Sequence, residues 1–87
     1  MKVVMLYRPN AEFARMVEDY MRDFERLHNR PIEPVSLDTP RGADLARTYD
    51  IVRYPALLVT SDNGSLLKEW QGERLPRMDE VAGYLRS

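Results

Sequence analysis

The strongest hydrophobic features of the chain are two short continuous apolar runs, Val3–Tyr7 and Ala56–Thr60. Continuous runs of this length are typical of strands that are covered on both faces. A weaker run at 32–37 contains Pro34, which cannot donate a ladder hydrogen bond, so it predicts a strand at or near a sheet edge. Residues 65–71 follow a turn-forming Asp-Asn-Gly segment and predict a hairpin partner for Ala56–Thr60.

Apolar residues elsewhere recur at three- and four-residue steps, which is the period of an amphipathic helix. The longest such segment predicts a helix at 11–28, with Asn10 as N-cap and Glu12 in the first turn. Its expected buried stripe is Phe13, Met16, Val17, Tyr20, Phe24 and Leu27. On its solvated face, Arg15 with Asp19 and Glu18 with Arg22 have the i,i+4 spacing of helical ion pairs.

Two shorter helices complete the pattern. Thr39 is expected to cap a helix at 40–50 with Pro40 in its first turn, and Pro76 is expected to begin the last helix. The order strand, helix, strand, helix, strand, strand, helix gives a parallel βαβ unit followed by a hairpin. The sequence therefore predicts an α/β fold in which one four-stranded mixed sheet is flanked by helices, with residues 1–87 forming a single domain.

Composition narrows the possible functions. A formal net charge of −1 argues against general nucleic-acid binding and against attachment to a membrane surface. The apolar run at 3–6 is too short for a signal-peptide core or a membrane span, so we expect a cytoplasmic protein. The chain has no cysteine, which excludes thiol–disulfide oxidoreductase activity. No cofactor or metal is expected, because the single histidine, His28, suits a solvated or capping role at a helix end.

Three segments resemble the thioredoxin/glutaredoxin superfamily in their order and local sequence. Pro9-Asn10-Ala11-Glu12-Phe13-Ala14 stands where that family has Pro-Gly-Cys-X-X-Cys, with Ala11 and Ala14 at the two cysteine positions. Val52-Arg53-Tyr54-Pro55-Ala56-Leu57 resembles the segment that carries the family's cis-proline, here Pro55. The Trp70-Gln71-Gly72 segment is similar to the end of the family's hairpin. The resemblance implies a thioredoxin-like fold that lacks the Cys-X-X-Cys motif and is redox-inactive.

The resemblance also implies a groove between the loop after the first strand and the cis-proline loop, where family members hold an extended thiol-containing peptide or glutathione. This groove combines aromatic and cationic side chains, and we expect it to bind a protein or peptide partner, or a glutathione-like or other anionic small ligand. Each side chain also has a structural alternative, since Phe13 suits the core, Asn10 suits a cap, Tyr54 suits shielding of the proline and the arginines suit solvated positions. The predicted groove residues are Arg8, Pro9, Asn10, Phe13, Arg53, Tyr54 and Pro55.

Three functions remain open at this point, and no catalytic residue is predicted. The leading hypothesis is a redox-inactive binding or protein-interaction module, for which the KaiB clock proteins, thioredoxin-like proteins without the cysteine pair, are a precedent. The second is a cysteine-free glutathione-dependent enzyme in which Tyr7, Arg8 or Asn10 activates a bound thiol. The third is a structural homo-oligomeric subunit, because a small domain gains from additional buried area. Trp70 is expected to pack on the last helix, although exposure together with Leu66 would instead mark a partner surface.

Overall fold

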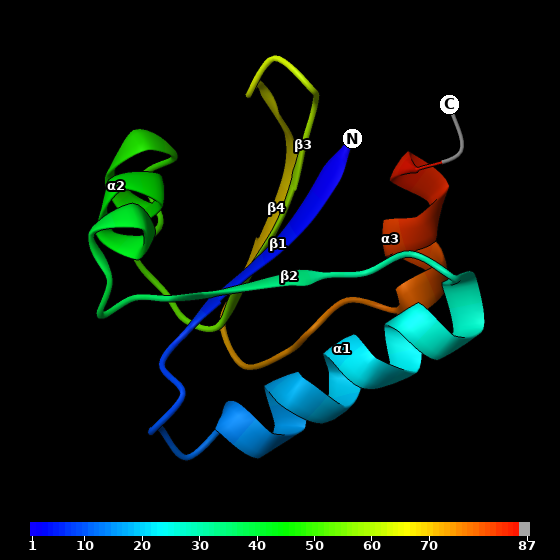
Figure 1. Cartoon of the computed structure of the whole chain (residues 1–87), viewed down its shortest axis with the longest axis horizontal. Coiled ribbons are helices and arrows are strands. Elements are labelled where there is room, and N and C mark those ends of the chain that lie inside the picture. Colours follow the sequence, from blue (N-terminus) through cyan, green and yellow to red (C-terminus); the bar gives the residue numbers. More distant parts are fainter. Residues whose placement is uncertain (86–87) are drawn as a thin grey trace.

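A computed structural model of the chain describes residues 1–85. It has one four-stranded mixed sheet in the order β2-β1-β3-β4, with α1 and α3 on one face and α2 on the other (Figure 1). The predicted order of elements and the mixed sheet are confirmed. The elements are β1 (Lys2–Tyr7), α1 (Ala14–His28), β2 (Glu33–Ser36), α2 (Pro40–Thr48), β3 (Ala56–Thr60), β4 (Leu66–Gln71) and α3 (Met78–Tyr84).

The two central strands explain the continuous apolar runs of the sequence. β1 pairs in parallel with β2 and antiparallel with β3. Alternate side chains of a strand point to opposite faces, so Met5 packs with the cluster under α1 and α3 while Leu6 packs with the cluster under α2. Because helices cover both faces, neither face of β1 or β3 needs polar side chains.

The edge strands differ from the central ones. β2 is one edge of the sheet, where Pro34 was expected. In β4, a register shift at Val59/Thr60 changes the alternation, so Leu66 packs on the α2 side and Trp70 on the α1/α3 side. The indole N–H of Trp70 donates to Glu80 of α3 at 3.2 Å, and its ring meets Tyr84 edge to face. Trp70 therefore packs on the last helix as predicted, and it forms no exposed patch with Leu66.

The start of α1 corrects the sequence prediction. The helix begins at Ala14 rather than at residue 11, and its N-cap is Phe13, with no side-chain cap. Asn10 is therefore not the cap, and Glu12 precedes the first turn. The reason is local, because the N–H groups of Ala11 and Ala14 donate to the carbonyls of Arg8 and Ala11 and hold this segment in turns.

The faces of α1 also differ from the prediction. Val17 and Phe24 are fully buried, but Met16 and Leu27 are 40% and 60% exposed and Phe13 lies outside the core cluster. Neither predicted i,i+4 pair is among the ion pairs of residues 1–85. The pairs that form are Arg22–Asp19, Arg22–Asp23 and Arg26–Asp23.

The ends of the shorter helices were predicted in part. Thr39 caps α2, because its hydroxyl accepts a hydrogen bond from the N–H of Gly42 at 3.1 Å. The helix ends at Thr48 instead of residue 50. α3 begins at Met78 rather than at Pro76. The Pro76 carbonyl instead accepts a hydrogen bond from the Tyr20 hydroxyl at 2.8 Å, which ties the connection before α3 to α1.

His28 is not a solvated residue at the end of α1. Its ring lies 4.9 Å from that of Phe24, and its Nε2 lies 3.8 Å from a carboxylate oxygen of Asp79 at the start of α3. The side chain is 17% exposed, so it packs between the two helices. Within residues 1–85 there is no group of three or more potential metal ligands. No helix in this part of the chain is long and apolar enough to cross a membrane.

Gly42 provides a direct test of how α2 sits against the sheet. A Cβ atom at this position would lie 2.0 Å from the Ser36 carbonyl oxygen at the end of β2. We expect Gly42→Ala to destabilise the fold by about 1–3 kcal/mol, because backbone must move to relieve the clash. Gly83→Ala is the matched control, since a Cβ there meets open space, and it should stabilise the helix by up to about 1 kcal/mol. Urea unfolding measures both; equal stability of the two variants would contradict this packing.

Candidate functional site

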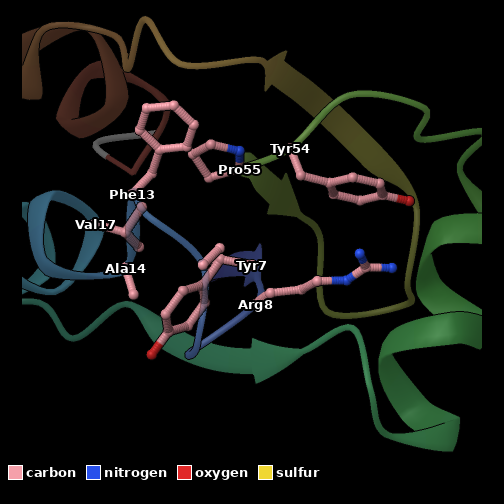
Figure 2. Close-up of a pocket in the computed structure, with 8 residues that line it drawn as sticks. Tyr7, Arg8, Phe13, Ala14, Val17, Tyr54 and Pro55 are labelled. Carbon is pink, nitrogen blue, oxygen red and sulfur yellow. The ribbon is translucent and has the colours of Figure 1, made fainter.

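A pocket of about 310 Å³ opens between the β1–α1 loop, the first turn of α1 and the loop before β3 (Figure 2). Its walls are mainly apolar, with two aromatic hydroxyl groups and one guanidinium. The lining residues are Tyr7, Arg8, Ala11, Phe13, Ala14, Val17, Tyr54 and Pro55.

The sheet register creates this pocket. Leu6 of β1 lies opposite Ala56 of β3 in the antiparallel ladder. The chain therefore leaves β1 at Tyr7 beside the point where it enters β3 after Pro55. Two loops that are separated in sequence by α1, β2 and α2 meet at this end of the sheet.

The loop before β3 is held firmly against β4. The Tyr54–Pro55 peptide bond is cis, and the Pro55 carbonyl accepts a hydrogen bond from the N–H of Gly72 at 2.9 Å. The side-chain oxygen of Gln71 accepts hydrogen bonds from the N–H groups of Val52 and Arg53 at 2.9 and 3.0 Å. These bonds give one wall of the pocket a fixed position.

The opposite wall comes from the turns before α1. Ala11 is exposed and Ala14 is buried, and both line the cavity. Phe13 lies between them in sequence and also lines the pocket, as does Pro55 on the loop before β3 (Figure 2). Alanine side chains leave space on this wall that a larger side chain would occupy.

Arg8 is the charged residue among the eight that line the pocket. Its Nε lies 3.8 Å from Asp38, and both side chains are 64% exposed. A long, exposed ion pair of this kind is weak and is screened by salt. The guanidinium therefore remains available to an anionic group that enters the pocket.

Tyr7 is the polar group of the pocket with the most defined environment. Its hydroxyl donates a hydrogen bond to Glu18 of α1 at 3.2 Å. Burial raises the pKa of Tyr7, and the hydrogen bond and negative charge of Glu18 raise it further. Tyr7 is therefore a neutral phenol at physiological pH, with its proton directed to Glu18, and it cannot act there as a base.

The structure brings together four of the seven predicted groove residues. Arg8, Phe13, Tyr54 and Pro55 line the pocket, as do both alanines at the proposed former cysteine positions. Pro9, Asn10 and Arg53 do not line it, although Arg53 lines an adjoining pocket. Asn10 is fully outside because the turns after Arg8 carry it toward solvent.

Sequence reasoning missed Val17 as a lining residue, and it named Tyr7 only as a candidate for activating a bound thiol. Tyr7 is the last residue of the first apolar run, and it reaches the pocket because β1 ends there. Val17 lies one helical turn after Ala14. That spacing is the signal that would have placed it on the same face.

Comparison with known proteins identifies the fold. No family model and no curated protein matches the chain. Among solved structures, it is similar to thioredoxin 1 from Thermosipho africanus TCF52B, with 10% identity and a TM-score of 0.66 over 98% of this chain and 90% of that chain. It is also similar to oxidised thioredoxin O2 from Arabidopsis thaliana, with 14% identity and a TM-score of 0.75 over 99% of this chain and 75% of that chain.

A third similar structure is thioredoxin-2, a component of the protein secretion machinery of the malaria parasite. It is 13% identical, with a TM-score of 0.66 over 97% of this chain and 79% of that chain. The chain therefore has a thioredoxin-like fold, and it has no cysteine. At these identities the likeness concerns the fold alone.

The raised pKa of Tyr7 gives a testable electrostatic property of the pocket. NMR titration of the tyrosine ring carbons should show Tyr7 ionising above its ordinary value of about 10. Glu18→Gln removes the negative charge that disfavours the phenolate, so it should lower the pKa of Tyr7, while burial keeps it above the ordinary value. Asp19→Asn, the neighbouring change on α1, should leave the pKa of Tyr7 nearly unchanged. An unchanged pKa in Glu18→Gln would contradict the contact.

Proposed function

We propose that this chain is a redox-inactive thioredoxin-like binding module that holds an extended peptide segment of a partner protein without covalent chemistry. The observation that carries the proposal is the open, apolar pocket lined by Ala11 and Ala14 beside Pro55. In a protein without cysteine, this space can receive a side chain but offers no thiol that could react with it.

The size and lining of the pocket suit one apolar side chain. A cavity of about 310 Å³ is at the lower end of the range for ligand sites. Phe13 offers a partly exposed apolar surface to a leucine or phenylalanine side chain, and the buried residues Ala14, Val17 and Pro55 lie beneath the opening. Burial of such a side chain contributes about 1.5–3 kcal/mol, which supports weak and reversible binding.

The backbone beside the pocket supports an extended ligand. Within residues 1–85, the N–H and the carbonyl of Tyr54 take part in no backbone hydrogen bond, and in an extended residue these two groups point to the same side. Both groups precede Pro55, at the rim of the pocket. An extended peptide that pairs with them would gain main-chain hydrogen bonds while one of its side chains enters the pocket.

The enzyme alternative gains less support from the same geometry. Of its three candidate residues, Tyr7 directs its proton to Glu18 and Asn10 lies outside the pocket. Arg8 remains, and a guanidinium can stabilise an anion but cannot accept a proton. These features favour binding over activation of a thiol.

The proposal is tested by titrating ¹⁵N-labelled protein with the end-blocked peptide Gly-Phe-Gly and, separately, with glutathione. We expect the peptide at millimolar concentration to shift amide resonances of the 8–14 and 53–56 segments, because these segments surround the pocket. Ala11→Trp should weaken peptide binding about tenfold or more, because a large exposed side chain at this position fills the opening. Ala43→Trp is the matched control on the exposed surface of α2, and it should bind normally.

Two outcomes would overturn the proposal. One is the absence of shifts from both probes at millimolar concentration. The other is equal binding by the Ala11→Trp and Ala43→Trp proteins, which would place the ligand elsewhere. Selective binding of glutathione without the peptide would replace the peptide proposal with a small-ligand site.

A further inference from the structure

A second pocket adjoins the first and has a different chemical character. It has a volume of about 540 Å³, and Tyr54 lines both pockets. The second pocket has two arginines and one glutamate in its walls. Its lining residues are Arg53, Tyr54, Gln71, Gly72, Glu73 and Arg74.

We infer that the peptide segment bound by this chain is acidic, with a carboxylate side chain next to the apolar side chain that enters the first pocket. The inference rests on the proposed function and specifies its partner. The apolar pocket would receive the hydrophobic side chain, and the Arg53–Arg74 pocket would receive the carboxylate. A single short peptide reaches both because Tyr54 lines both pockets, so they adjoin each other.

The two arginines of the second pocket, Arg53 and Arg74, have no carboxylate partner within residues 1–85. Arg41 shows the contrasting case, because it pairs with Glu33 between α2 and β2. Glu73 is the one acidic residue of the lining, so positive charge is in excess there.

This local charge is opposite to that of the whole chain, whose formal net charge is −1. Arg8 adds a third cation at the first pocket, paired only weakly with Asp38. Three arginines therefore lie around the two pockets, with Glu73 as the one acidic side chain among the lining residues. A peptide that carries carboxylates beside an apolar residue complements this surface in both charge and polarity.

The backbone under the second pocket is held in place. Gln71 accepts hydrogen bonds from the N–H groups of Val52 and Arg53, and its own amide N–H donates to Glu69 at 2.5 Å. Gly72 has a φ of +104° and donates to the Pro55 carbonyl. The backbone of Arg53 is therefore held in place, which lowers the entropy lost when a carboxylate binds at this pocket.

The test compares three end-blocked peptides, Asp-Phe-Asp, Asn-Phe-Asn and Lys-Phe-Lys, by NMR titration at low ionic strength. We expect Asp-Phe-Asp to bind about fivefold to tenfold more tightly than Asn-Phe-Asn, with Lys-Phe-Lys weakest. The advantage of Asp-Phe-Asp should shrink at high salt, because the arginines are exposed.

Charge reversal then locates the effect. Arg53→Glu and Arg74→Glu should each weaken Asp-Phe-Asp about fivefold or more and leave Asn-Phe-Asn almost unchanged. Arg26→Glu is the matched control, because it makes the same charge change at an exposed position in the C-terminal half of α1. An equal loss of affinity in Arg26→Glu would mean that net charge alone acts, and it would overturn the site.

The outcomes separate this inference from the proposed function. If all three peptides bind equally at the first pocket, or Lys-Phe-Lys binds most tightly, the inference is wrong and the binding module stands. If no peptide binds, the proposed function itself fails. If Asp-Phe-Asp binds best and loses this advantage in the Arg53 and Arg74 variants, the acidic specificity is established.

Discussion

The antiparallel pairing of β1 with β3 is the constraint on which the site depends. It places Leu6 opposite Ala56, so that the chain leaving β1 and the chain entering β3 meet at one end of the sheet. Both strands are central and almost fully buried, which makes this register costly to change, since a slip by one residue would turn each apolar side chain to the other face. The position of Tyr7 and Arg8 beside Pro55 follows from the core.

The chemistry of the site depends on the side chains that lie where the β1–α1 loop meets the loop before β3. The turns that precede α1 present Ala11 and Ala14 there, and small apolar side chains leave a cavity in place of reactive groups. Of the polar groups in the pocket, the Tyr7 hydroxyl donates a hydrogen bond to Glu18, and the Arg8 side chain is exposed to solvent. Recognition by shape and charge is the chemistry that such a surface supports.

The sequence allowed most of the fold to be predicted, because burial leaves a periodic trace. The runs that became β1 and β3 were recognisable from continuous apolar residues, and Thr39 was recognisable as a cap from its own chemistry. The start of α1 was not predictable in this way, because asparagine is a residue type that favours the N-cap position and Asn10 precedes the apolar pattern of the helix. The hydrogen bonds that instead form turns at Ala11 and Ala14 leave no trace in the apolar pattern.

The site was predictable only in part, for a related reason. Arg8, Phe13, Tyr54 and Pro55 were expected from two sequence segments that resemble a known fold. Tyr7 and Val17 join them through strand direction and helix rotation. The hydrogen bond between Tyr7 and Glu18 was not predictable, because the sequence placed Tyr7 in a buried strand and Glu18 on the solvated face of a helix. The bond forms because of the way α1 packs on the sheet.

We propose that an apolar peptide side chain enters the pocket lined by Ala11, Ala14 and Pro55. Intermolecular nuclear Overhauser effects between the phenylalanine ring of bound Asp-Phe-Asp and the methyl groups of Ala11 and Ala14 test this binding mode. We expect such effects to both methyl groups, because both residues line the cavity. A bound peptide whose ring shows effects only to residues outside the pocket would contradict it.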